Sequence, residues 1–187
     1  MRPVICRGVC SVDFCIPLLV QQNLDRSSVF NRSWAEYKVG FNDSRGNYWL
    51  GNDLLSQLTL TGRYKLRFDL QSRTNTSNWY SAEYSSFRVQ PESDNYRLQV
   101  SRYSGNAGRV SHTSGHDSLS WQNGMEFTTF DRDNDQHLSW NCAAVTGGGF
   151  WHKDCCYCCV NSDERHFNWY GMPGVALQSS RMWLQCK

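Results

Sequence analysis

Apolar and polar side chains alternate in several segments of the chain, which is typical of strands that bury one face. In residues 64–70, four large apolar side chains alternate with two basic residues and one aspartate. Successive side chains of a strand point to opposite faces, so this period of two predicts a half-buried strand. The same strand character recurs in three further segments, residues 84–89, 96–103 and 125–130.

Two short helices are predicted upstream of these strands. Ser33 and Glu36 have the spacing of a capping box, and Gly40 supplies a helix end. Asp53 is expected to cap the second helix. The apolar residues expected to face inward are Trp34, Tyr37 and Phe41 in the first helix, and Leu54, Leu55 and Leu58 in the second. The whole pattern predicts an α+β fold with a twisted antiparallel sheet and few helices, followed by loop after Asp131.

Length and composition fit one globular domain. A chain of 187 residues buries roughly two-thirds of its unfolded surface. Only 19% of residues are charged, the net charge is +2 and there are eight tryptophans, so the chain is predicted to be neither disordered nor a nucleic-acid binder. No stretch reaches the ~20 apolar residues that span a bilayer. Residues 1–22 make a poor signal peptide and are interpreted as an atypical leader or residual subdomain before a domain over residues 23–187.

Cysteine usage predicts a secreted, extracellular protein. Nine cysteines are too many for an ordinary cytosolic enzyme and favour disulfides formed in an oxidising compartment. Three N-x-S sequons, at Asn31, Asn42 and Asn75, are consistent with N-glycosylation of a secreted chain.

Asp131, Asp133 and Asp135 lie at alternate positions directly after an apolar run. Crowded carboxylates repel one another, and a calcium ion with six to eight oxygen ligands relieves that cost. An EF-hand is excluded, because Gln136 stands where that loop needs glycine and Cys142 where it needs glutamate. The alternative is a solvated acidic turn whose side chains cap backbone amides.

Four blocks follow one another along the chain: residues 31–41 (NRSWAEYKVGF), residues 48–52 (YWLGN), residues 123–135 (NGMEFTTFDRDND), and the pair Cys142 and Cys155, which brackets GGGFW. In this order they resemble the fibrinogen C-terminal domain. That extracellular module is shared by fibrinogen chains, ficolins, tachylectins, angiopoietins and tenascins. The resemblance covers most of the chain and implies the fibrinogen-like α+β fold.

The resemblance also implies a calcium site. By that resemblance, the side chains of Asp133 and Asp135 would bind calcium together with the main-chain carbonyls of His137 and Ser139. His137 would contribute its backbone and not its imidazole.

A disulfide between Cys142 and Cys155 is implied in the same way, together with a cis peptide bond between Asp154 and Cys155 that turns main-chain amides toward a ligand. The residues implied to contact the ligand are Asp154, Cys155, Cys156, Tyr157, Trp151 and Trp169. Cys156 stands where the family usually has histidine, which can donate a hydrogen bond, so weak binding of N-acetylated sugars is expected.

We therefore expect a lectin-like recognition module, stabilised by calcium, that binds glycans or acetylated groups. The alternative is a protein-interaction module of the angiopoietin and tenascin type that binds a receptor or a matrix component. No nucleic-acid partner and no membrane span are expected, and oligomerisation would use regions outside this chain.

Cysteines cluster at residues 155–159, with His152 and His166 nearby, which also suggests zinc. Adjacent cysteines point in different directions, and no second pair of cysteines or histidines lies at the spacing of a zinc finger. Further disulfides are therefore favoured over zinc. Their pairing stays open for Cys6, Cys10, Cys15, Cys156, Cys158, Cys159 and Cys186. No serine lies in a nucleophile elbow, and no enzyme is expected.

Overall fold

The computed structural model describes residues 16–108, 117–155, 157–172 and 174–187. Its strands are β1 (Leu18–Asn23), β2 (Phe41–Asn42), β3 (Tyr48–Trp49), β4 (Tyr64–Ser72), β5 (Trp79–Val89), β6 (Leu98–Gly105) and β7 (Leu177–Cys186). They form one seven-stranded sheet in the order β2-β3-β1-β7-β4-β5-β6. Every pairing in it is antiparallel, so the predicted α+β class is confirmed.

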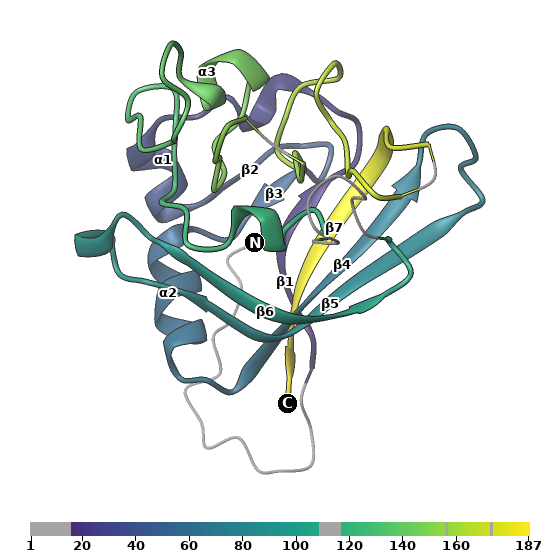
Figure 1. Cartoon of the computed structure of the whole chain (residues 1–187), viewed down its shortest axis with the longest axis horizontal. Coiled ribbons are helices and arrows are strands. Elements are labelled where there is room, and N and C mark those ends of the chain that lie inside the picture. Colours follow the sequence, from purple (N-terminus) through teal and green to yellow (C-terminus); the bar gives the residue numbers. More distant parts are fainter. Residues whose placement is uncertain (1–15, 109–116, 156, 173) are drawn as a thin grey trace.

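The helices of the described residues are short. They are α1 (Trp34–Val39), α2 (Asn52–Leu60) and α3 (Cys142–Thr146), with the 3-10 turns η1 (Ser28–Phe30), η2 (Glu92–Asp94) and η3 (Ser120–Gln122). In Figure 1, α1 and α2 lie at one side of the sheet, and the loops after β6, with α3, lie across its upper end. The loop-rich part of the molecule is therefore gathered at one end.

The capping box that opens α1 is present as predicted. The Ser33 hydroxyl accepts the Glu36 N–H, and the Glu36 carboxylate accepts the Ser33 N–H at 2.9 Å. Asp53 was predicted to cap α2, and this prediction is wrong. The N-cap of α2 is Gly51, which has φ +106°. Asp53 lies inside the first turn, where its carboxylate accepts the Tyr96 hydroxyl at 2.6 Å.

Two predictions for the second half of the chain are wrong. Residues 125–130 form no strand, since only the bridges of Thr128 to Phe150 and of Thr129 to Arg132 occur there. The segment predicted as loop contains β7, which pairs with β1 and with β4 at the centre of the sheet. Its alternation is hidden because a β-bulge interrupts the strand and the buried Ser180 stands where an apolar residue would reveal the inner face.

The core lies between the sheet and the loops above it. Leu66, Phe68 and Leu70 of β4 are fully buried, as the alternation predicts. Between them and the loops, aromatic rings fill the interior, with centroids 5.3 Å apart for Phe127 and Trp151. Aromatic contacts of this kind dominate core energetics because each ring buries a large area.

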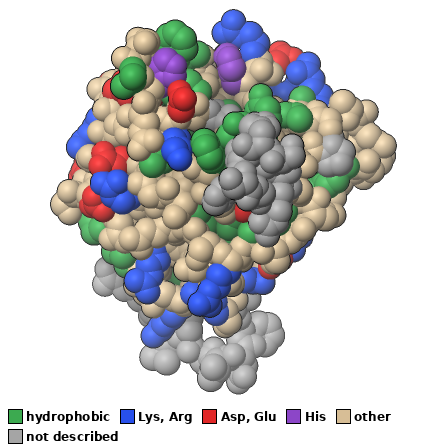
Figure 2. Space-filling model, viewed as in Figure 1, with side chains coloured by type: hydrophobic (Ala, Val, Ile, Leu, Met, Phe, Trp, Pro, Cys, Tyr) green, Lys and Arg blue, Asp and Glu red, His purple; other side chains and the backbone are tan. Residues whose placement is uncertain are grey.

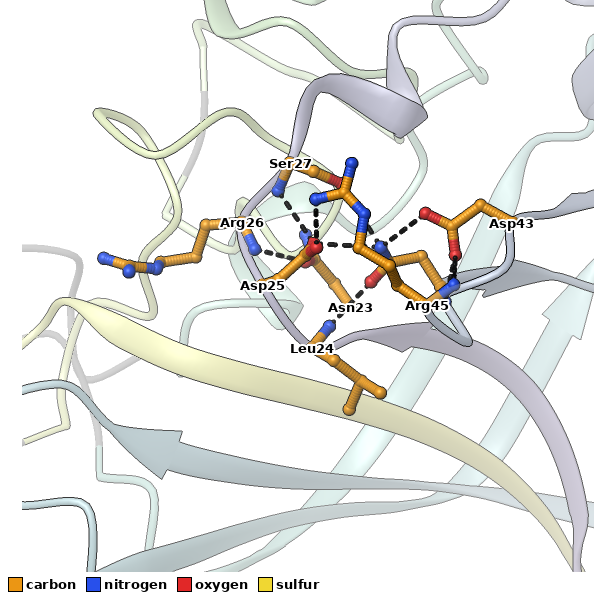
Figure 3. A network of polar contacts seen from close by, with 8 residues as sticks. Asn23, Leu24, Asp25, Arg26, Ser27, Asp43 and Arg45 are labelled. Carbon is orange, nitrogen blue, oxygen red and sulfur yellow. Dashed lines mark hydrogen bonds and ion pairs between the residues drawn. The ribbon is translucent and has the colours of Figure 1, made fainter.

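A polar network joins the end of β1 to the turn between β2 and β3 (Figure 3). The buried Asn47 amide donates to the carboxylates of Asp25 and Asp43 at 2.9 Å each. Its oxygen accepts the Leu24 N–H at 2.8 Å, and Arg45 pairs with Asp25 at 2.7 Å. Saturated buried polar groups of this kind fix one local geometry.

Strand β1 also crosses the predicted domain boundary between residues 22 and 23. Leu18 pairs with Leu184 of β7, and Gln22 pairs with Tyr48 of β3. Residues 18–22 therefore belong to the sheet of the globular domain and not to a leader. The rest of the predicted leader, residues 1–15, lies outside the described residues.

Candidate functional site

The three aspartates of the acidic loop separate into two groups. Asp131 turns toward α1 and accepts the Trp34 N–H at 2.9 Å. Asp133 and Asp135 remain together, because the Asp133 carboxylate accepts the Asp135 N–H at 3.2 Å. The crowding of three carboxylates expected from the sequence is therefore reduced to two.

Asp135 is held by backbone amides on both sides. Its oxygens accept the His137 N–H at 2.8 Å and the Cys142 N–H at 2.7 Å. Burial raises the pKa of Asp135 and the charge of Asp133 adds to the rise, against the amide bonds, which lower it. Within the described residues no lysine or arginine pairs with either carboxylate.

These residues fit a calcium ion by their chemistry. Asp133 and Asp135 offer two neighbouring carboxylates without a basic partner. In the described part of the chain, the main-chain carbonyls of His137 and Ser139 accept no hydrogen bond, which leaves both oxygens available. The described side chains form no cluster of three or more acidic, histidine or cysteine groups, so any hard cation here would depend on main-chain oxygens.

The predicted disulfide between Cys142 and Cys155 is present, with the two Cα atoms 5.0 Å apart. It joins the first residue of α3 to the loop below the acidic segment. The implied cis bond is absent: no described peptide bond is cis, and that between Asp154 and Cys155 is trans. Cys155 itself has a positive φ of +50°.

Two of the predicted ligand contacts are core residues. Trp151 and Trp169 are both fully buried, Trp151 against Phe127 and Trp169 against Phe68. Neither ring is therefore accessible to make the ligand contact that the resemblance implied. Cys156 lies outside the described residues.

Tyr157 is half-buried and belongs to an aromatic cluster that the sequence did not reveal. Its ring is 5.5 Å from that of Trp121 and 5.1 Å from that of Tyr170. The Lys153 ammonium lies 4.1 Å from the Trp121 ring centroid, within cation–π range. These residues come from separate segments, so only the fold brings them together. Asp154, which follows Lys153, has a side chain that is 69% exposed.

Apolar side chains also gather around the acidic loop. Figure 2 shows them beside a histidine and acidic groups at the α3 end of the molecule. The large apolar residues exposed in this segment are Phe130, Leu138, Trp140 and Val145. The Trp140 ring stacks on His137 with centroids 4.1 Å apart, which restricts its motion. This end of the molecule therefore presents exposed apolar groups next to carboxylates, with the Trp140 ring held by His137.

The cysteines of the cluster serve mainly in disulfides. Cys159 and Cys186 are disulfide-bonded, and Cys158 is a buried free thiol whose pKa burial raises well above its usual value. His152 is fully buried and bonds to the Gly148 carbonyl at 2.9 Å. None of these described groups assembles a zinc site.

The three sequon asparagines, Asn31, Asn42 and Asn75, are all exposed. Asn31 is the C-cap of η1, Asn42 lies in β2, and Asn75 lies in the turn between β4 and β5. Glycosylation at each is sterically open.

A sheet of this order, with a loop-rich end carrying an acidic loop and a disulfide, defines a fibrinogen-like globe domain. Residues 15–184 match the model of the family described as fibrinogen beta and gamma chains, C-terminal globular domain. The chain belongs to this family, and the predicted resemblance is confirmed. Fibrinogen-like globe domains are binding modules and not enzymes, in agreement with the sequence prediction.

Curated relatives extend well beyond this chain. Angiopoietin-related protein 2 of Mus musculus and of Homo sapiens is 42% identical over 137 residues, which is 73% of this chain and 26% of the relative. The fibrinogen alpha chain of Rattus norvegicus is 47% identical over 146 residues, 74% of this chain and 18% of the relative. The chain thus spans about a quarter or less of these proteins.

Solved structures show the same fold. The fibrinogen-like globe domain of human ANGPTL2 superposes with a TM-score of 0.75 at 35% identity, covering 90% of this chain and 79% of that one. Lamprey fibrin D-dimer, complexed with the peptide ligand Gly-His-Arg-Pro-amide, has a TM-score of 0.73 at 28% identity and covers 90% and 60%. In the described residues, no helix is long and apolar enough to cross a bilayer.

Proposed function

We propose that this chain is the protein-binding globe of an extracellular protein, and that it contacts its partner through the surface formed by Trp121, Tyr157 and Tyr170. This is the second of the two functions expected from the sequence. The observation that carries the proposal is the packing of the Tyr157 ring against those of Trp121 and Tyr170, two residues after the disulfide-bonded Cys155.

Clustered aromatic residues at a surface are well suited to an interface. Tyr and Trp supply large contact areas with few rotatable bonds, and they dominate the binding energy of many protein interfaces. Here Tyr170 is 36% exposed, and its ring is braced by Tyr157. A braced ring loses little conformational entropy when a partner binds.

A protein partner is supported over a glycan by two further observations. Trp151 and Trp169, which were expected to wall a pocket for an acetylated sugar, are buried in the core. The relatives include angiopoietin-related proteins, and lamprey fibrin D-dimer, a solved neighbour, carries a peptide ligand.

Calcium is part of the proposal. We infer that Asp133 and Asp135, with the carbonyls of His137 and Ser139, hold one ion that fixes the acidic loop. Calcium would neutralise the two carboxylates that have no basic partner. The loop is joined to the binding surface because the Gln136 N–H donates to the Lys153 carbonyl at 2.7 Å.

Secretion is supported by the disulfides. Bonds at Cys142, Cys155, Cys159 and Cys186 persist in oxidising compartments and are rare in the cytosol.

Binding of the labelled, disulfide-intact chain to cell surfaces tests the proposal. Cells are treated beforehand either with trypsin or with enzymes that remove N- and O-linked glycans and glycosaminoglycans. We expect trypsin to abolish binding and glycan removal to leave it in place. Retention after trypsin with loss after glycan removal would contradict a protein partner.

Calorimetry with N-acetylglucosamine separates the lectin alternative from this one. The proposal expects no affinity tighter than millimolar, because the predicted aromatic walls are buried and cannot contact the sugar. Micromolar, calcium-dependent binding would favour the lectin function instead.

A further inference from the structure

We infer that Asp131 is a positioning residue for the cation loop: it ties the loop to α1 and thereby holds the carboxylates of Asp133 and Asp135 in place for calcium. This inference rests on the proposed calcium site. It assigns Asp131 a task other than metal ligation, although the sequence places it in the same alternating run as the two ligands.

The contacts of Asp131 run away from the cation loop. One oxygen, Oδ1, accepts the Trp34 N–H at 2.9 Å and the Thr129 hydroxyl at 2.7 Å. Thr129 is fully buried and Trp34 is 8% exposed, so both donors are fixed in the protein interior. An oxygen engaged by two such donors is a poor candidate for a metal ligand.

The Trp34 side chain is held by two contacts, which make it a rigid anchor. Its indole N–H donates to the Glu92 carboxylate at 2.8 Å. The Arg132 guanidinium lies 4.0 Å from the centroid of its ring. Arg132 also donates to the Asn95 side chain, so the residue between Asp131 and Asp133 is fixed to the same part of the core.

The other side of the loop is anchored independently. Asp135 accepts the N–H of Cys142, the first residue of α3. The intervening Asn134 donates through its amide to the Phe127 carbonyl at 2.7 Å. Asp133 therefore lies between two residues that are hydrogen-bonded to helices, Asp131 to α1 and Asp135 to α3. Only a short piece of chain is free to move when a cation binds.

Such anchoring matters because ordering a loop at the moment of binding costs conformational entropy. Outer groups that orient metal ligands commonly change metal affinity by roughly 10- to 100-fold when they are removed. We expect the anchor at Asp131 to fall at the lower end of that range.

Calcium titration of three variants by calorimetry tests the inference. Asp131→Ala removes both hydrogen bonds and should weaken calcium binding about tenfold. Asp131→Asn removes the same charge but keeps an oxygen that can accept from Trp34 and Thr129, and it should retain most of the affinity. Thr129→Val keeps every charge and removes one donor, so it should lower the affinity about threefold, between wild type and Asp131→Ala.

The outcomes separate the inference from the proposed calcium site. Absence of calcium binding by the wild-type chain would overturn both. Wild-type binding with equal affinity in Asp131→Ala would overturn the inference alone. Equal losses in Asp131→Asn and Asp131→Ala would show that charge, and not anchoring, is the contribution, and would also overturn it. Melting temperatures in EDTA identify any variant that is merely unfolded.

Discussion

At the scale of single residues, burial decides which groups keep their ordinary chemistry. His152 is the clearest case, because its ring is fully buried and burial lowers its pKa to about 4, although the Gly148 carbonyl and the charge of Asp133 favour the protonated form. The imidazole is therefore neutral in the folded protein at neutral pH. Sequence alone suggested a metal ligand at this position, and only the fold shows that the ring is sealed in the core.

This burial predicts acid sensitivity. In the unfolded chain His152 binds a proton near pH 6.5, whereas the folded chain binds it near 4. The contribution of neutral His152 to the free energy of unfolding is fully present above pH 6.5. It is lost as the pH falls from 6.5 to 4, a decrease of about 3 kcal/mol. Urea unfolding from neutral to acid pH should show a shallower loss for His152→Gln than for wild type. The variant His166→Gln, which removes a partly exposed histidine paired with Asp163, shows the effect of losing a histidine outside the core, and an unchanged slope in His152→Gln would refute the argument.

Asp133 carries the second prediction at this scale. Ligand binding to the folded state adds RT ln(1 + [L]/Kd) to its stability. Excess calcium should raise the melting temperature of wild type and leave that of Asp133→Ala unchanged. Asp154→Ala removes a nearby carboxylate that is not a proposed ligand, so its response should match wild type. An equal rise in the Asp133→Ala protein would count against the site.

At the scale of elements, short sequence patterns correctly predicted the segments that are specified by neighbouring residues in the sequence. The capping box at Ser33 opens α1, and the alternation of residues 64–70 becomes β4. Strand β7 could not be predicted in this way, because a β-bulge interrupts its alternation and its inner face includes the buried Ser180, which hydrogen-bonds to Gln21 of β1. The start of α2 was missed because a glycine caps it through backbone conformation and not through a side chain.

Gly40 shows how tightly α1 is fitted to the next segment. It has φ +89°, and a Cβ there would lie 2.5 Å from the Leu50 carbonyl oxygen. Gly124 has a similar φ of +84° with nothing within 4 Å of the equivalent position in the described structure. Gly124→Ala should thus report backbone strain alone, on the order of 1 kcal/mol. Gly40→Ala should cost about 2 kcal/mol more from the clash. Equal losses in chemical denaturation would show that the close approach relaxes freely.

At the scale of the whole molecule, the sheet is a support for a loop-rich end where the candidate sites meet. The family, the disulfide of Cys142 and Cys155 and the acidic loop could all be predicted from the sequence, because they are carried by contiguous motifs. The aromatic surface could not, since Trp121, Tyr157 and Tyr170 come from separate segments and their rings meet only in the folded chain. For the same reason Trp151 was misplaced at the surface.

Cell-surface binding of two matched variants tests the central claim most directly. Tyr170→Ala removes a ring of the proposed surface that is 36% exposed, whereas Trp79→Ala removes a ring of β5 that is 42% exposed and lies outside it. Loss of an aromatic hot spot costs on the order of 2 kcal/mol, roughly a thirtyfold loss of affinity. We predict that loss for Tyr170→Ala and affinity close to wild type for Trp79→Ala. Full binding by Tyr170→Ala, in a protein with wild-type melting temperature, would contradict the assignment of this surface.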